Sequence, residues 1–241
     1  MSAASFRQIL RREFKAYFLT PIGYIVIVIF LLVSGWFFFS SFFLAGRADL
    51  RGFFSLLPVI LSFAVPAITM RLFSEEFRSG SYEILLTLPV TAFNILMGKF
   101  LAALAFVTIM ILPTLSYPLF INFLGELDWG PVAGGYIGAV FLAASYCAIG
   151  LFASSLTRNQ IVAFIIAAAV CFLLTILDGM LFFIPRGLVR ISQFVSSSYH
   201  FQNISKGILD SRDLIYFASV CFLALFGAHA VIEARKEGAP A

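Results

Sequence analysis

Six long stretches of this chain contain no charged residue, and they restrict the fold more than any other feature. They comprise residues 16–46, 52–70, 100–125, 129–157, 159–177 and 214–232. A helix needs about 20 apolar residues to cross a bilayer, and all six stretches reach or nearly reach that length. The strands of a membrane β-barrel alternate apolar and polar residues, whereas runs such as residues 23–32 show no alternation. The sequence therefore predicts an all-α membrane protein with six transmembrane helices.

The predicted organisation is a single transmembrane domain over residues 1–241. We place the spans at 22–45, 53–71, 92–121, 132–155, 161–184 and 213–233. A polar cytoplasmic segment, 72–90, joins the second span to the third. An external segment, 185–212, joins the fifth span to the sixth and is expected to form two short amphipathic helices.

The distribution of Lys and Arg predicts the orientation, because six spans place both termini on one side. That side carries ten basic residues: Arg7, Arg11, Arg12, Lys15, Arg71, Arg78, Lys99, Arg158, Arg235 and Lys236. The opposite side carries six: Arg47, Arg51, Arg186, Arg190, Lys206 and Arg212. The positive-inside rule makes the first group cytoplasmic. We expect both termini in the cytoplasm and the chain in a bacterial inner membrane. The orientation in the membrane then accounts for the net charge of +4, so we expect no nucleic-acid partner.

Residues 5–20 have the pattern of an N-terminal interfacial helix. Apolar residues fall near one helical face: Phe6, Ile9, Leu10, Phe14, Tyr17 and Phe18. Basic residues populate the other face, as in helices that lie along a membrane surface. Pro21 then turns the chain into the first span. The alternative is that the first span simply begins early and its charged side chains reach back to the surface. The apolar run is too long for the core of a cleaved signal.

Prolines and small residues distinguish the next three spans. Pro58 and Pro66 fall in the second span, and prolines 113 and 118 in the third, so we expect both spans to bend. The fourth span is rich in glycine and alanine and contains Gly134 and Gly138, four residues apart. Small residues let membrane helices approach closely. They predict packing inside the bundle or, alternatively, a contact between two copies.

Asp178 and His200 are the two polar residues near the outer side that could belong to a functional site. Asp178 is the one carboxylate in an otherwise apolar span, and a carboxylate inside a membrane is a candidate for a transport or relay role. Its expected place near the interface, where water reaches it, is the alternative explanation. His200 is expected to be solvated rather than a ligand.

The sequence lacks the residue patterns of an enzyme. It contains no G-x-x-x-x-G-K-[ST] phosphate-binding loop, so ATP hydrolysis is not expected here. Cys147, Cys171 and Cys221 fall in different spans and match neither a disulfide nor a metal pattern. We therefore expect no catalytic residue, no metal site and no directly bound cofactor. Any work across the membrane must be powered by another subunit.

The polar stretch from Met70 to Asn94 is expected to contain an amphipathic helix. Ser74 is positioned to cap it, and Leu88, just before a proline, would end it. An apolar stripe would face the bundle, and an acidic face would face the cytoplasm. Thr91 is expected to cap the third span, and Lys99 to extend back to the cytoplasmic surface. An interfacial helix without any partner is the alternative.

This stretch also carries a resemblance to a known family. The run M-R-L-F-S-E-E-F-R-S-G-S-Y-E-I-L-L-T-L-P-V-T, residues 70–91, precedes the helix start N-I-L-M-G-K-F. Together they resemble the type-2 ABC transporter permeases. The stretches S-S-L-T-R-N-Q-I-V-A-F (154–164) and Y-H-F-Q-N-I-S-K-G-I-L-D-S-R-D-L-I-Y-F (199–217) are similar to the gliding-motility-associated branch and the nitrous-oxide-reductase maturation permeases.

The resemblance implies a permease subunit that works as a homodimer or with a related permease. It also implies that a separately encoded ABC ATPase, in two copies that bind ATP and Mg, docks on a coupling helix within 72–90. By position, the ATPase-facing residues would be Glu75, Glu76, Arg78, Gly80 and Glu83. A periplasmic or further membrane subunit would fit such a complex. The alternative is a membrane-embedded mechanical or scaffold subunit that moves no solute.

Overall fold

The computed structural model describes residues 3–45, 50–82, 91–125, 127–180, 189–208 and 210–237. These residues are almost entirely helical and contain no strand. The elements are α1 (Ala3–Leu19), α2 (Pro21–Ala45), α3 (Arg51–Thr69), α4 (Arg71–Ser79), α6 (Ala92–Ile111), η1 (Leu112–Leu115), α7 (Ser116–Leu124), α8 (Trp129–Leu156), α9 (Gln160–Ile176), α10 (Val189–Val195), α11 (Ser197–Ser205) and α12 (Ser211–Glu237). The prediction of an all-α membrane protein is confirmed.

Five helical stretches in the described residues are long and apolar enough to cross a membrane. They are Pro21–Ser40, Arg51–Ser79, Ala92–Phe123, Trp129–Leu156 and Ser211–Lys236. The shorter apolar helix α9 has 17 residues, about 25 Å of helix. The span that we predicted there, 161–184, ends among residues that the structure does not describe.

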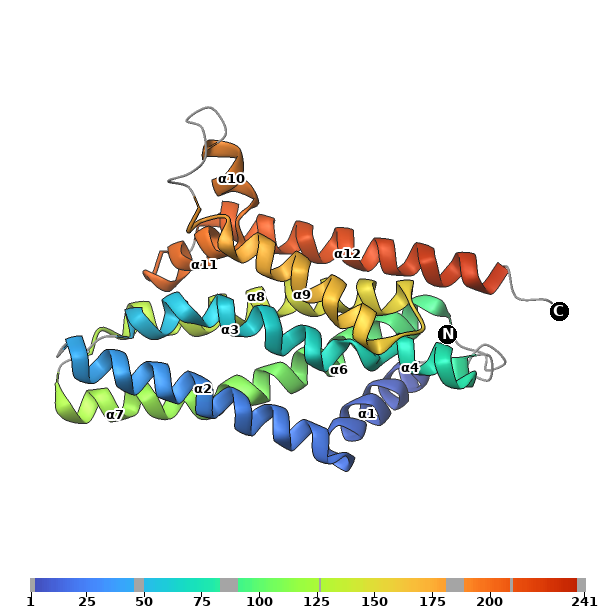
Figure 1. The fold of residues 1–241 in the computed structure, drawn as a ribbon, viewed down its shortest axis with the longest axis horizontal. Coiled ribbons are helices and arrows are strands. Elements are labelled where there is room, and N and C mark those ends of the chain that lie inside the picture. The colour runs from blue at the N-terminus through green and yellow to red at the C-terminus, as the bar shows by residue number, and fades with distance from the viewer. Residues whose placement is uncertain are drawn as a thin grey trace.

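The long helices lie side by side, and both termini are at the same end of the molecule (Figure 1). The helices α1 and α4 are near that end, whereas α10 and α11 are at the other. Helix α8 is the central element. Most residues of its apolar part are buried, whereas most residues in the apolar parts of α2 and α12 are not. Most packing therefore occurs around α8.

Helix α1 is separate from α2, since the helix breaks at Thr20 and the two run in different directions (Figure 1). The alternative of one early-starting span is therefore wrong. Ile9 and Tyr17 are the buried positions of α1 that pack on α6. Tyr17 stacks on Phe106 with ring centroids 4.5 Å apart. A Cβ atom on Gly98 would lie 2.8 Å from Ile9 Cγ2, so the missing side chain lets α1 approach closely.

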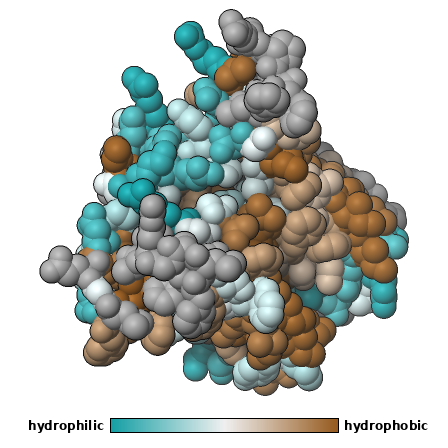
Figure 2. Space-filling model, turned by 60° about the vertical axis from the view of Figure 1, so that its left-hand side comes forward, coloured by the Kyte–Doolittle hydropathy of each residue, from teal (hydrophilic) through white to brown (hydrophobic). Residues whose placement is uncertain are grey.

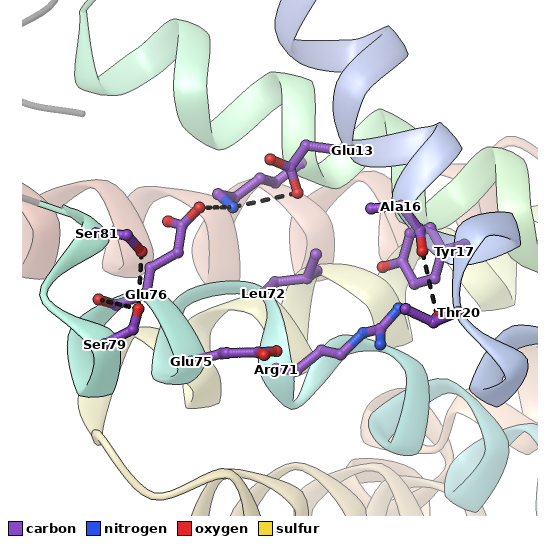
Figure 3. Close-up of a pocket in the computed structure, with 11 residues that line it drawn as sticks. Glu13, Ala16, Tyr17, Thr20, Arg71, Leu72, Glu75, Glu76, Ser79 and Ser81 are labelled. Carbon is purple, nitrogen blue, oxygen red and sulfur yellow. Dashed lines mark hydrogen bonds and ion pairs between the residues drawn. The ribbon is translucent and has the colours of Figure 1, made fainter. Parts of the chain in front are cut away.

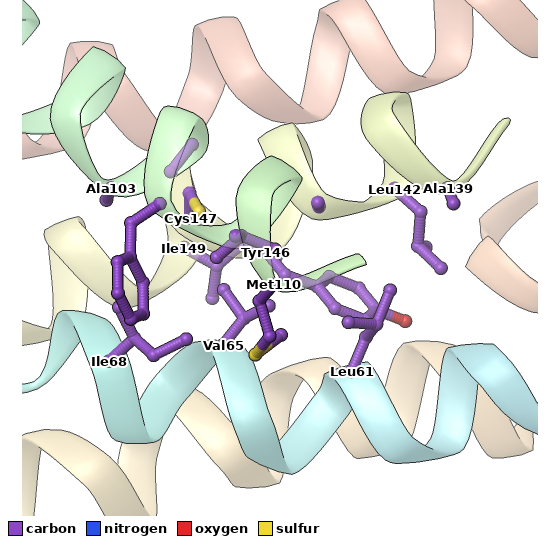
Figure 4. Close-up of a cluster of buried hydrophobic side chains, with 14 of the residues drawn as sticks. Leu61, Val65, Ile68, Ala103, Met110, Ala139, Leu142, Tyr146, Cys147 and Ile149 are labelled. Atoms are coloured by element: carbon purple, nitrogen blue, oxygen red, sulfur yellow. The ribbon is translucent and has the colours of Figure 1, made fainter. Parts of the chain in front are cut away.

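The core lies where α3, α6 and α8 meet (Figure 4). Leu61 and Val65 of α3, Met110 of α6 and Tyr146 of α8 are fully buried there. The Tyr146 hydroxyl lies 2.6 Å from the Thr175 hydroxyl of α9. A phenol buried in this core therefore has a polar partner, as burial requires.

Small residues of α8 allow its neighbours to approach. A Cβ on Gly134 would lie 2.3 Å from the Ile204 carbonyl oxygen of α11, and one on Gly150 would lie 1.9 Å from Thr69 Oγ1 of α3. The prediction that small residues serve packing inside the bundle is confirmed at these positions.

The proline-containing spans behave differently from each other. Helix α3 continues through Pro58 and Pro66. The span predicted at 92–121 is instead interrupted, because α6 ends at Ile111 and the 3-10 turn η1 contains Pro113. Proline lacks the N–H that an α-helix uses at this position. Thr114 donates a hydrogen bond of 2.7 Å from its hydroxyl to the Ile111 carbonyl within the turn.

The surface has apolar flanks and a more polar end. Large apolar side chains are exposed along α2, α9 and α12, among them Leu32, Trp36, Ile165, Leu173 and Phe222. Figure 2 shows the molecule turned so that the end bearing α10 and α11 comes forward, with hydrophilic residues at the upper left and hydrophobic residues over the lower and right-hand parts. Exposed apolar helix faces of this kind fit contact with lipid.

We predict that Gly150→Ala destabilises the protein. Alanine favours helix formation, but its Cβ would meet both Oγ1 and, at 2.9 Å, Cβ of Thr69. Rotation of the threonine cannot remove the second contact, so α3 must move, at a cost of about 1–3 kcal/mol. Thermal unfolding of purified protein would measure this. Gly179→Ala is the matched control, because its Cβ would meet only the Ile176 carbonyl oxygen at 3.5 Å. Equal melting temperatures for the two variants would contradict the prediction.

Candidate functional site

Helix α4 continues from α3 after a single residue, Met70. The Ser154 hydroxyl of α8 inserts at this junction. It accepts hydrogen bonds from the backbone N–H groups of Phe73 at 3.0 Å and Ser74 at 3.1 Å, and it donates one of 2.8 Å to the Met70 carbonyl. A side chain inserted into the helical hydrogen-bond ladder is a recognised cause of a kink.

Ser74 therefore does not cap a helix, and that prediction is wrong. It lies inside α4, is fully buried, and donates its hydroxyl proton to the Met70 carbonyl. The N–H groups of Phe73 and Ser74, in the first turn of α4, are bound instead by Ser154. The cap predicted at Thr91 is confirmed, since its hydroxyl accepts from the Asn94 N–H at 3.4 Å.

Helix α4 ends at Gly80, so the predicted continuation to Leu88 is wrong at this point. Gly80 adopts φ of +72° as the C-cap, a conformation that favours glycine because other residues clash there. The chain turns and is helical again at residues 81 and 82. Glu83 and the rest of the predicted segment, to residue 90, lie outside the described residues.

The two faces of α4 differ in their surroundings. Leu72, Phe73 and Phe77 are buried against the bundle, whereas Glu75 and Arg78 are exposed. Ser79 and Gly80 extend the exposed face. Neither Glu75 nor Arg78 has an ion-pair partner within the part of the chain that the structure describes. This charged face is free to contact another molecule.

Glu76 does not share that face. It belongs to an ion cluster formed by the exposed Arg12 and the largely buried Glu13 of α1, Glu76 of α4 and the buried Lys99 of α6. Lys99 Nζ lies 2.7 Å from Glu76 Oε1 and 3.3 Å from Glu13 Oε2. The Arg12 guanidinium lies 2.7 Å from Glu13 Oε1 and 3.7 Å from Glu76 Oε1. Figure 3 shows Glu13 and Glu76 approaching the same point from α1 and α4.

The prediction that Lys99 extends to the surface is wrong. Its side chain is 1% exposed, and its ammonium lies 5.3 Å from the centre of the Phe73 ring. A buried ammonium needs compensation, and two carboxylates and an aromatic face supply it. Sequence reasoning missed Glu13. The available signal was its place between Ile9 and Tyr17 at helical spacing, on the face of α1 that packs inward.

The surroundings of Glu13 change its acidity. Burial favours the neutral carboxyl, but the Lys99 ammonium and the Arg12 guanidinium outweigh burial and hold the pKa of Glu13 below its usual range. The carboxylate is therefore the form that the folded protein stabilises.

A polar pocket of about 340 Å³ lies beside the cluster, between α1 and α4 (Figure 3). Two buried oxygens here, the Tyr17 hydroxyl and Glu76 Oε2, have no hydrogen-bond partner among the residues that the structure describes. The Arg71 guanidinium lies 5.2 Å from the centre of the Tyr17 ring. Glu75 also lines the pocket, so the pocket joins the ion cluster to the exposed face of α4.

The end of α12 is attached to the same region. Arg235 donates a hydrogen bond of 3.0 Å to the Leu156 carbonyl at the end of α8, and its guanidinium lies 4.5 Å from the centre of the Phe77 ring. Helix α4 is thus held by contacts from α1, α6, α8 and α12.

The other candidate, Asp178, lies at the opposite end in a turn after α9. It is partly exposed, and its Oδ2 accepts a hydrogen bond of 3.3 Å from the Gln202 amide of α11. The arrangement joins α9 to α11 and brings no second carboxylate to Asp178.

His200 is buried, so the expectation of a solvated side chain is wrong. Its Nδ1 pairs with Asp213 Oδ1 of α12 at 2.5 Å, and its Nε2 lies 3.0 Å from the Phe194 carbonyl of α10. The ring stacks on Tyr216 with centroids 4.1 Å apart. This histidine joins α10 and α11 to the start of α12.

No group of three His, Cys, Asp or Glu residues that could hold a metal ion occurs among the described residues. The three cysteines are free thiols. The charged side chains described above either form ion pairs or lie at least partly exposed on the surface.

The fold and the two polar ends define a multi-pass helical membrane protein. A family model described as "ABC-2 family transporter protein" matches residues 3–208, and the chain belongs to this family. It is a membrane permease subunit of an ABC transporter, a class that works with an ATPase partner and in a dimeric arrangement. A comparison with curated protein sequences gives no significant match.

Replacing Lys99 with methionine should destabilise the protein by up to about 3–5 kcal/mol, because the largely buried Glu13 and Glu76 carboxylates then keep only the exposed Arg12 guanidinium as a counter-charge. Thermal unfolding would measure this loss, with Lys236→Met, an exposed lysine of α12, as the control. The triple variant Glu13→Gln, Glu76→Gln, Lys99→Met should recover much of the stability, since the one charge left unpaired, on Arg12, is 55% exposed and solvated. A triple variant less stable than Lys99→Met would contradict this account.

Attachment of α1 should weaken in acid. The pKa of Glu13 is lower in the folded state, so its contribution is complete above the ordinary glutamate pKa of about 4.3 and is lost as pH falls through the lowered value. Hydrogen exchange of the α1 amides is the measurement. Glu13→Gln should exchange faster than wild type at pH 7, and the two should converge as pH falls through the lowered pKa of Glu13. Glu75→Gln, an exposed carboxylate, should match wild type. Equal exchange by wild type and Glu13→Gln at pH 7 would disprove the effect.

Proposed function

We propose that a separately encoded ABC ATPase docks on the exposed face of α4 and drives this permease subunit. The observation that carries the proposal is the unpaired charge of Glu75 and Arg78 on a helix whose other face is firmly packed. Gly80 ends that helix in an open turn, where a Cβ would meet nothing within 4 Å. Glu76 is committed to Lys99, so its role is to fix α4 rather than to contact the ATPase. Glu83 remains a proposed contact.

Force applied to α4 would reach the membrane spans by two routes. The first is the junction with α3, where Ser154 binds the backbone of Met70, Phe73 and Ser74 and so ties α4 to α8. The second is the ion cluster, which joins α4 to α1 and α6. ATP-driven closure of two ATPase copies would push on α4 and move α3 and α6 together. Access along the dimer axis would change as a result.

The remaining parts of the proposal follow from the family and the sequence. ATP and Mg would bind to the ATPase and not to this chain. The second membrane subunit would be another copy or a related permease, with a periplasmic or membrane accessory subunit as a further partner. We place the chain in a bacterial inner membrane with both termini in the cytoplasm. Residues 154–164 and 199–217 favour the gliding-motility or nitrous-oxide-reductase maturation branch.

Charge reversal at Glu75→Lys and Arg78→Glu should abolish copurification of the ATPase, because complementary charges across an interface become like charges. Tagged permease purified from native membranes would be tested for an associated P-loop ATPase and for ATP hydrolysis. Arg51→Glu is the matched control, since it reverses an exposed charge at the opposite end of the molecule.

Unaltered complex formation by the double variant would refute docking on this face. The reconstituted wild-type complex addresses the alternative function. ATP turnover in vesicles without movement of any solute would favour a mechanical or scaffold subunit.

A further inference from the structure

A second site lies at the end of the molecule opposite the ion cluster. A pocket of about 650 Å³ is enclosed by α10, α11 and the first half of α12. Its volume falls within the range of about 300–1,000 Å³ that is typical of small-molecule sites. The permease mechanism proposed above uses none of its residues.

The end of this pocket near the start of α12 is charged. Arg190 of α10 and Arg212 of α12 are exposed, and neither guanidinium has a hydrogen-bond or ion-pair partner within the described ranges. The Asp210 carboxylate accepts from the Arg212 backbone N–H at 3.0 Å and so caps α12. The Asp213 carboxylate also lines the pocket; its Oδ1 pairs with His200, and its buried Oδ2 has no hydrogen-bond partner among the described residues. Two cationic groups therefore remain available to a ligand.

The rest of the lining is mixed: Gln193, Asn203 and Ser219 are polar, and the apolar side chains include a stripe of α12. Ile215 and Leu223 are 63% and 67% exposed, and Phe194 of α10 is 70% exposed. Val220 lies between them on the same stripe. From Arg212 to Leu223 the helix rises about 16 Å. That distance is close to half of the hydrocarbon core of about 30 Å, the length of one acyl chain in one leaflet.

We propose that this pocket binds one phospholipid, with its phosphate held by Arg190 and Arg212 and an acyl chain along Ile215, Val220 and Leu223. Arginine donates paired hydrogen bonds that fit phosphate oxygens. The pocket separates charge from apolar surface along a membrane-spanning helix, as a phospholipid does. Asp210 offers a carboxylate to the ammonium of a zwitterionic head group.

The bound lipid would hold α10 against α12. Among the described residues, α10 has no buried position, and its polar contacts near the pocket include the Phe194 and Val195 carbonyls bound by His200 and Tyr216. A lipid between α10 and α12 would fill the space that these contacts leave open.

Native mass spectrometry of the purified protein in detergent tests the site. We expect one retained phospholipid per chain, and occupancy should fall at least about tenfold in the double variant Arg190→Gln, Arg212→Gln, since hydrogen bonds to charged groups are among the strongest. Arg158→Gln, an exposed arginine at the other end, is the control. Equal occupancy in all three proteins would overturn the proposal. Equally tight binding of inorganic phosphate or glycerophosphate would also overturn it, because the acyl chain would then contribute nothing.

A second experiment leaves both arginines intact. A photo-crosslinking residue at Leu223 should capture the copurified phospholipid, whereas the same residue at Phe226, which is exposed but outside the pocket, should not. Crosslinking of Leu223 to a polypeptide would show that a protein partner occupies the pocket and would reject the lipid. Equal lipid capture at both positions would indicate bulk lipid and would reject a specific site.

Discussion

The Lys99 ammonium is the group on which the arrangement of the helices at the end with both termini most depends. Burying an ammonium without compensation costs far more than a typical domain's margin of stability. Lys99 is compensated only where Glu13 of α1 and Glu76 of α4 reach it together. With Arg12 the cluster contains two cations and two carboxylates and is formally neutral. Displacing α1 or α4 would remove a carboxylate from the buried ammonium and leave its charge uncompensated. The two short helices and α6 therefore form one mechanical unit.

The hydrogen bonds between Ser154 and the backbone around Met70 add a second constraint on the same unit. The donors of Phe73 and Ser74 are satisfied by a serine 80 or so residues away in the chain. Residue preferences at helix N-termini predict that Ser74 caps a helix, since serine followed by acidic residues is typical of a first turn. The rule fails here because Ser154 reaches the site from α8, and no local pattern contains that information. Tertiary contact decides where α4 begins.

Sequence patterns succeeded where the physics is local or concerns the bilayer. Charge-free length predicted the helical membrane fold, helical spacing predicted the inward face of α1 through Ile9 and Tyr17, and Thr91 was identified as a cap. They failed for Lys99 and His200, for which exposure was predicted because an ionisable side chain is usually solvated. Both are buried because carboxylates distant in sequence meet them, Glu76 in one case and Asp213 in the other. Pairing across the fold is the information that a single sequence does not supply.

At both ends of the molecule, a buried polar pair holds short helices against a long one. At one end Lys99 joins α1 and α4 to α6, and at the other His200 joins α10 and α11 to α12. A short helix buries too little apolar surface to hold a fixed position alone. A polar pair shielded from water is directional and costly to separate, because each partner would be left unsatisfied. Each short helix should therefore move with the span that holds it. Movement of α4 would displace α6, and movement of α12 would displace α10 and α11. Long spans thus connect the exposed charged face of α4 at one end to the pocket beside α12 at the other, the two sites for which we propose an ATPase and a phospholipid.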